Sequence, residues 1–90
     1  QVLLKKNELE ISGKSNAYKH KADSGNIVTF YSCPICASTI YWEIPYFKDY
    51  FAVAVGCFAD KDFPAPTFSF YEDRKHCWLT LPDTITEHIN

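Results

Sequence analysis

Two cysteines separated by two residues form the motif with the clearest chemistry in this sequence, Cys33-Pro34-Ile35-Cys36. A turn with this spacing brings two thiolates to one tetrahedral zinc ion, and backbone amides of the turn then donate to the sulfurs. Pro34 fixes one φ angle and stiffens the turn. We therefore predict that Cys33 and Cys36 are metal ligands and form half of a zinc site.

Two other interpretations of this cysteine pair stay open. The thiols can be buried without metal, or they can form a redox pair. A redox pair requires a thioredoxin-like setting, in which the N-terminus of a following helix lowers the pKa of the first cysteine. The residues on both sides of the motif favour strands, and no helical pattern follows Cys36. The flanking sequence thus argues against redox chemistry of the thioredoxin kind.

The chain offers few further ligands for a zinc ion, which needs four in a structural site. Cys57, Cys77 and His76 are the candidates. Cys57 ends an apolar segment, where a free cysteine is usually a small buried hydrophobic residue. Cys77 lies beside His76 without a second ligand at zinc-knuckle spacing. We therefore expect the remaining ligands to lie in sequence beyond these 90 residues.

Other polar residues give weaker indications of chemistry. Glu43 lies between Trp42 and Ile44, and burial there would raise its pKa, although the polar face of a strand is the simpler interpretation. The histidines are scattered and are expected on strands or at the surface: His20, His76 and His88. The acidic residues near the loops are expected to be solvated: Asp60, Asp62, Glu72 and Asp73.

In the segments that must position these residues, hydrophobic side chains recur at every second position. Alternating or β-branched segments predict strands over 27–31, 38–44, 50–58 and 67–71, and Leu9 and Ile11 alternate with polar residues. Residues 60–66 must be a loop, since prolines cannot donate to a sheet ladder. Thr84 and Glu87 have the spacing of a capping box, the one hint of a helix. The pattern predicts a small, mainly β, mostly antiparallel domain.

The length and charge of the chain limit the number of its domains and the kinds of partner it can have. Ninety residues predict a single domain over 1–90, and 47% hydrophobic with 22% charged residues excludes a disordered chain. A net charge of −2 and a pI near 5.8 argue against nucleic acid as a partner. No signal peptide and no apolar run near the ~20 residues of a membrane helix is visible, so we expect a cytoplasmic protein whose cysteines are reduced.

The order of these features resembles the glutathione-dependent formaldehyde-activating (GFA) family, which shares its domain with CENP-V. Residues 30–39, Phe-Tyr-Ser-Cys-Pro-Ile-Cys-Ala-Ser-Thr, resemble the family phrase in which an aromatic residue precedes CPxCGS. Residues 53–60 are similar to its glycine–small–apolar–acidic segment. The further matches are Pro64 and Pro66 in the proline loop, Trp78-Leu79 near the end, and residues 9–13, 18–19 and 24–26 upstream.

The resemblance implies a β-tent, a fold of stacked antiparallel sheets, around a zinc knuckle. It also implies a carbon–sulfur lyase that joins glutathione and formaldehyde into S-hydroxymethylglutathione, or that acts on another adduct of a small thiol with an aldehyde. In such enzymes the later CPxC pair, here Cys33 and Cys36, shares a structural zinc with an N-terminal CxC pair. A separate N-terminal cysteine cluster holds the catalytic zinc.

Two departures from the family pattern lead to further expectations. The N-terminal cysteine clusters have no counterpart in these residues, and the chain has no Met at position 1. We therefore expect the C-terminal portion of a GFA-like domain, inactive by itself, whose unpaired strand edges favour a homodimer. Ala37 replaces the family glycine after the second ligand, and a left-handed backbone there would add on the order of 1 kcal/mol of strain. The alternatives are a non-catalytic, zinc-stabilised β binding module and a β domain without metal.

Overall fold

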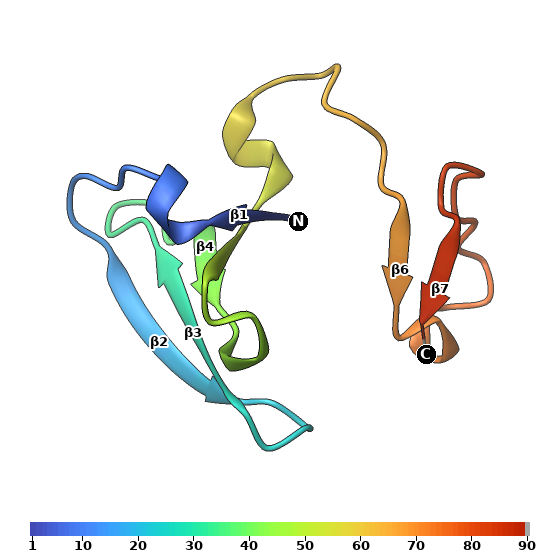
Figure 1. The fold of residues 1–90 in the computed structure, drawn as a ribbon, viewed down its shortest axis with the longest axis horizontal. Coiled ribbons are helices and arrows are strands. Elements are labelled where there is room, and N and C mark those ends of the chain that lie inside the picture. The colour runs from blue at the N-terminus through green and yellow to red at the C-terminus, as the bar shows by residue number, and fades with distance from the viewer. Residues whose placement is uncertain (90) are drawn as a thin grey trace. The chain divides into compact units, whose positions relative to one another are not determined.

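Short alternating segments in the first part of the chain form one antiparallel sheet of five strands in the computed structural model, which describes residues 1–89 (Figure 1). The order of the strands across the sheet is β1-β5-β4-β3-β2. Their bounds are β1 (Val2–Lys5), β2 (Asn16–Lys21), β3 (Ile27–Ser32), β4 (Thr39–Glu43) and β5 (Tyr50–Val53). This sheet belongs to the first of two compact units, Gln1–Asp60 and Lys61–Asn90, which are described separately below.

Two hairpins order the middle of the sheet. The turn between β2 and β3 contains Gly25 at φ 90°, a left-handed conformation that glycine adopts without steric cost. The second hairpin joins β3 to β4 through the segment from Cys33 to Ser38. A register shift between Tyr31 and Ser32 precedes this second turn, so the cysteine motif begins where regular pairing is already perturbed.

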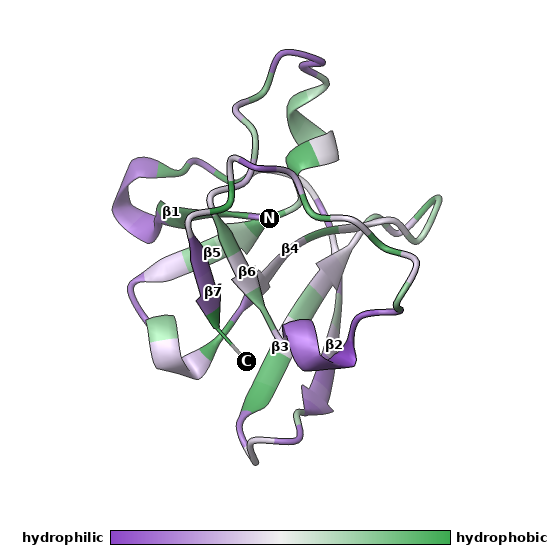
Figure 2. Ribbon diagram, turned by 90° about the vertical axis from the view of Figure 1, so that its right-hand side faces the viewer, coloured by the Kyte–Doolittle hydropathy of each residue, from purple (hydrophilic) through white to green (hydrophobic). Residues whose placement is uncertain are grey.

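The packing of the sheet centres on a small residue and a row of aromatic rings. Ala52 on β5 is only 1% exposed and pairs with Leu3 on one side and Trp42 on the other. The Tyr41 ring stacks on Tyr31 with centroids 4.5 Å apart and meets Phe51 edge-on at 5.0 Å. Figure 2 shows the difference between neighbouring strands, with β3 largely hydrophobic and β2 hydrophilic. All six residues of β2 are exposed, as expected for an edge strand.

Short 3-10 helices connect the strands of the first unit: η1 (Lys6–Glu8), η2 (Pro45–Phe47) and η3 (Val55–Phe58). Pro45 begins η2, where its missing N–H leaves no hydrogen bond unmade. The Lys6 amide donates to the Asp49 carbonyl at 3.0 Å, which carries the pairing of β1 with β5 one step into η1.

The second unit contains a parallel pair of three-residue strands, β6 (Phe68–Phe70) and β7 (Glu87–Ile89), and the 3-10 helix η4 (Glu72–Arg74). Ile85, 8% exposed, is its buried residue among those described. The Thr84 hydroxyl donates to the Pro66 carbonyl at 2.8 Å, and the Thr86 amide donates to the Thr67 carbonyl at 3.0 Å. These bonds attach the tail to the segment that leads into β6.

The structure confirms the mainly β, antiparallel prediction for the large sheet, with β3, β4 and β6 inside the predicted ranges 27–31, 38–44 and 67–71 to within one residue. The loop at 60–66 is also confirmed. No helix among residues 1–89 is long and apolar enough to cross a membrane. The single-domain prediction for 1–90 stays a prediction, as do the β-tent and its zinc knuckle.

Three details of the predicted elements are wrong. The strand expected over 50–58 ends at Val53; the Ala54 amide still bonds to the Ile40 carbonyl, and the chain then turns into η3. The alternation of Leu9 and Ile11 forms no strand, and the strand that pairs with β5 at this end of the sheet is β1. The tail forms β7 instead of a helix, since the Thr84 hydroxyl bonds to a carbonyl and does not cap.

Candidate functional site

The cysteine motif lies in the tight turn between β3 and β4. The Cys33 amide donates to the Ser38 carbonyl at 2.9 Å, and the Ala37 amide donates to the Cys33 carbonyl at 2.9 Å. These two bonds close the turn from both ends. Cys33 is half-buried, whereas Cys36 is exposed.

Polar groups of the turn are directed at both sulfurs. The Ile35 amide donates to Cys33 Sγ at 3.4 Å, which is the amide–sulfur contact expected of a zinc-binding turn. Cys36 Sγ lies 3.3 Å from the Ser38 hydroxyl, which donates to the sulfur when the thiol is ionised. The side-chain and backbone hydrogen bonds with Ser38, together with one from Cys33, lower the pKa of the Cys36 thiol. The turn therefore favours thiolate, the form that binds metals.

Ala37 has a left-handed backbone, at φ 64°. This is the position where the family pattern has glycine, and the conditional expectation of a left-handed residue is met. A Cβ in this conformation approaches the following carbonyl oxygen and costs on the order of 1 kcal/mol. The turn keeps its geometry despite this cost.

The residues of the turn fit one half of a tetrahedral zinc site, and the described chain does not bring the other half to it. No group of three or more His, Cys, Asp or Glu side chains within residues 1–89 is arranged to hold a metal ion. The assignment of Cys33 and Cys36 as metal ligands therefore stays a prediction.

The candidate additional ligands are described within their own units. Cys57 is exposed in η3, where its thiol donates to the Ile40 carbonyl at 3.8 Å. It is thus not the buried hydrophobic residue that its apolar neighbours predicted. Cys77 is exposed in the second unit, and the neighbouring His76 ring stacks on Trp78 with centroids 5.5 Å apart.

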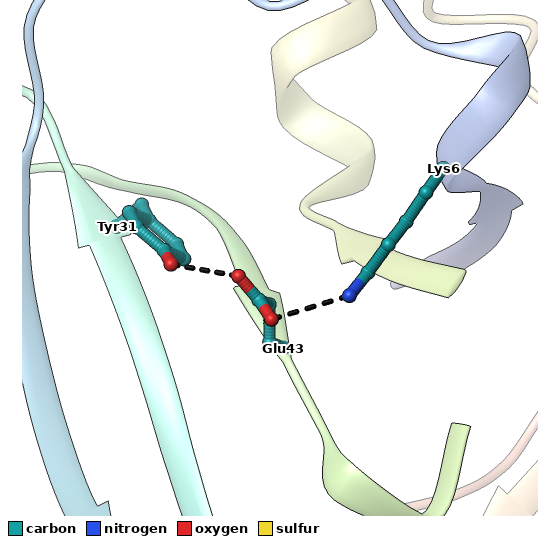
Figure 3. A network of polar contacts seen from close by, with 3 residues as sticks. All are labelled: Lys6, Tyr31 and Glu43. Carbon is teal, nitrogen blue, oxygen red and sulfur yellow. Dashed lines mark hydrogen bonds and ion pairs between the residues drawn. The ribbon is translucent and has the colours of Figure 1, made fainter. Parts of the chain in front are cut away.

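A second polar arrangement connects two strands of the sheet with the 3-10 helix η1 (Figure 3). The Tyr31 hydroxyl donates to Glu43 Oε1 at 2.7 Å, and the Lys6 ammonium lies 3.2 Å from Glu43 Oε2. Lys6 also lies over the Phe51 ring, 4.9 Å from its centroid. Both carboxylate oxygens of Glu43 therefore have a donor, and β3, β4 and η1 are joined through one side chain.

The hydrogen bonds and charges of this network shift the pKa of Glu43 in the direction opposite to the shift that burial alone would cause. The hydrogen bond from the Tyr31 hydroxyl holds the pKa of Glu43 below its ordinary value; burial opposes this shift, and Lys6 adds to it more weakly than Tyr31. The hypothesis of a raised pKa at Glu43 is therefore wrong, because sequence neighbours do not reveal a partner 12 or 37 positions away. The hydrogen bond to the carboxylate, then burial, raises the pKa of Tyr31 to about 12.

A shallow hollow of about 150 Å³ adjoins Glu43 and is lined by Lys6, Ile27, Thr29, Glu43, Ile44, Pro45 and Lys48. It contains two ammonium groups and one carboxylate, and the carboxylate is already paired with Lys6. The net positive charge of the lining therefore comes from the exposed Lys48. We assign no chemistry to this hollow, since a single surface lysine does not define a ligand.

The second unit holds a carboxylate–imidazole pair that the sequence did not indicate. Glu72 Oε1 lies 2.5 Å from His88 Nδ1, because the register of β6 and β7 places His88 opposite Ser69, three residues before Glu72. The bond from His88, followed by one from Ser69, lowers the pKa of Glu72. Glu72 is thus paired, although a solvated loop residue was expected there. His88 lies on a strand and is half exposed, as expected.

Comparison with known proteins gives one match. The family model described as "Glutathione-dependent formaldehyde-activating enzyme" matches residues 1–74, which include β1 to β6 and the cysteine turn. Searches of the curated proteins and of the solved structures found no match. The matched range covers most of the 90 residues. The chain therefore belongs to the glutathione-dependent formaldehyde-activating enzyme family.

Proposed function

We propose that this chain is a GFA-like carbon–sulfur lyase domain in which Cys33 and Cys36 supply two of the four ligands of a structural zinc. The observation that carries the proposal is the turn between β3 and β4, where amides close the backbone and the Ile35 N–H is directed at Cys33 Sγ. The family match over residues 1–74 supports the same role.

A structural zinc at this position would cross-link the turn to its other ligands and so add to folding stability. The residues of this chain do the rest of the positioning. The bonds from Cys33 to Ser38 and from Ala37 to Cys33 fix the backbone of the turn that carries the two cysteines. Such preorganisation lowers the entropy cost of binding.

The substrate that we propose is an adduct of glutathione, or of another small thiol, with an aldehyde. The family name supports glutathione and formaldehyde as its parts. Within residues 1–89, no cluster of three metal-ligating side chains provides a catalytic centre. We therefore propose that these 90 residues bind the adduct but do not accelerate its formation. The role of the cysteine turn is structural.

NMR with glutathione and formaldehyde tests this function. We expect the adduct to shift amide resonances of the zinc-loaded chain at saturable concentrations, with glutathione alone giving smaller shifts. Exchange between free glutathione and the adduct should keep its uncatalysed rate. An absence of saturable shifts would contradict the binding proposal, and an accelerated exchange would contradict the proposed lack of catalysis.

A zinc-stabilised binding module is the second candidate, and exposed aromatic residues favour it. Tyr46 is 79% exposed while its ring packs edge-on against Phe47 at 4.8 Å, so it forms a rigid apolar projection. Aromatic side chains of this kind are enriched at protein interfaces. The same NMR experiment separates the two candidates, since a module for proteins would show no shift with the small adduct. The homodimer stays a prediction that sedimentation can check.

A further inference from the structure

We propose that the turn between β3 and β4 is a reversible oxidation site, at which Cys33 and Cys36 form a disulfide by exchange with a small-molecule disulfide. Within residues 1–89 the structure contains no disulfide, and all four cysteines are free thiols. The inference goes beyond the proposed function, because it requires only the geometry of the turn. It differs from thioredoxin-like redox chemistry, which needs a helix after the motif.

The first argument is the proximity of the two sulfurs. The Ala37 amide donates to the Cys33 carbonyl across the turn, which brings Cys36, the residue before Ala37, close to Cys33. In a tight turn the first and fourth Cα atoms lie within about 7 Å, and disulfides span about 4.4–6.8 Å. The backbone bonds from Cys33 to Ser38 and from Ala37 to Cys33 hold this geometry in the reduced chain. Closing the disulfide therefore needs little rearrangement of the backbone.

The second argument is the different exposure of the two thiols. Cys36 is exposed and reachable by a soluble disulfide, whereas Cys33 is half-buried. This arrangement assigns the attacking role to Cys36 and the resolving role to Cys33. The other two cysteines, Cys57 and Cys77, are also exposed, but neither has a second cysteine at this close spacing in the sequence.

The exchange proceeds in two balanced steps. The Cys36 thiol loses its proton and its sulfur attacks one sulfur of the small disulfide, which forms a mixed disulfide and releases one small thiolate that takes up the proton. The Cys33 thiol then loses its proton, attacks Cys36 Sγ and releases the second small thiolate, which is protonated in turn. The two cysteines are oxidised by two electrons, and the small disulfide is reduced to two thiols.

This oxidation has a consequence for metal binding that rests on the proposed function. A disulfide removes both thiolates from the turn, and zinc requires thiolate ligands. The oxidised chain would therefore hold no zinc at this position, and a bound zinc would protect the pair from oxidation.

The test uses oxidised glutathione as the probe on the full reduced chain, followed by alkylation and mass spectrometry. We expect Cys33 and Cys36 to lose two hydrogens together, while Cys57 and Cys77 form glutathione adducts or stay reduced. In the Cys33→Ser variant, the adduct at Cys36 should persist, at least about tenfold more abundant than in the wild type, since the resolving thiol has a high effective concentration.

Proteolytic mapping of the wild-type chain identifies the linked pair without any substitution, which covers the case of a variant that does not fold. A persistent adduct at Cys36 with Cys33 intact would overturn the proposal, as would equal reactivity of all four cysteines. Zinc content of the reduced chain is measured separately. A chain that binds zinc but forms no disulfide refutes only this inference, and one that forms the disulfide but binds no zinc refutes only the proposed zinc site.

Discussion

The Tyr31 hydroxyl donates to the Glu43 carboxylate at 2.7 Å across the boundary between β3 and β4. In the register of these strands Glu43 pairs with Thr29, so Tyr31 is its diagonal neighbour on the same face. Diagonal neighbours are close enough for long side chains to interact. This contact, with Lys6 on the other carboxylate oxygen, joins the hairpin that carries the cysteine turn to the β1 edge of the sheet.

Removal of this hydrogen bond should destabilise the first unit. Tyr31→Phe is expected to cost about 1 kcal/mol, the usual net value for one hydrogen bond. Tyr18→Phe is the matched control on exposed β2, with an expected change near zero. Urea unfolding at pH 7 measures both. Equal costs for the two variants would show that the contact does not contribute.

The same carboxylate should make stability depend on pH. The pKa of Glu43 is lowered from 4.5 in the folded chain, so its stabilisation is fully present above about pH 4.5 and is lost as pH falls through the lower folded value. The free energy of unfolding should therefore decrease more steeply below pH 4.5 in the wild type than in Glu43→Gln. Parallel curves for the two proteins would contradict the lowered pKa.

The ion pair of Lys6 should make a small contribution that salt screens. Lys6→Met is expected to lose about 0.5 kcal/mol at low ionic strength, because the pair is partly exposed and the contact with the Phe51 ring is also lost. Lys48→Met, at an exposed position beside the same hollow, should change little. Unfolding in low and high salt distinguishes them. A Lys6 effect that does not decrease with salt would argue for packing alone.

Glycine at position 37 should stabilise the chain. Relief of the left-handed strain at Ala37, on the order of 1 kcal/mol, exceeds the entropy cost of glycine, so Ala37→Gly is expected to gain about 0.5 kcal/mol. Ala54→Gly is the control, since φ is −66° there and glycine should cost about 0.5–1 kcal/mol. Thermal unfolding gives both values. Loss of stability in Ala37→Gly would mean that the turn relaxes to another conformation.

The tight packing at Ala52 should reject a larger side chain. Ala52→Leu inserts three carbons at a position only 1% exposed between β1 and β4, and overpacking of this kind costs about 1–3 kcal/mol. Ala17→Leu on exposed β2 should change stability by less than about 0.5 kcal/mol. Similar values for the two variants would place β5 at an edge instead of between its neighbours.

The sequence predicted the strands whose patterns are local and missed what depends on distant partners. The β-branched run at Ile27 and the aromatic run before Pro45 indicate β3 and β4 because composition and turn residues suffice there. The end of β5 at Val53 was missed, since the apolar run continues to Phe58 while the backbone turns. The prediction of a capped helix at the tail overlooked that β7 pairs with β6.

The features of the candidate site also fall into those with a local sequence signal and those that depend on distant residues. The Cys33–Cys36 spacing identified the turn, because four consecutive residues contain its geometry. The contacts of Glu43 with Tyr31 and Lys6 arise from strand pairing over 12 and 37 positions, and the sequence carries no local signal for them. The left-handed conformation of Ala37 was indicated only through the glycine that the family has at that position.

Zinc stoichiometry of the purified, reduced chain tests the central claim most directly. After equilibration with zinc, elemental analysis should find more metal in the wild type and in Cys57→Ser than in Cys33→Ser and in Cys36→Ser, because only the latter two remove a proposed ligand. No zinc in the wild type, or zinc retained when Cys33 is replaced, would contradict the assignment of this turn as a metal-binding site.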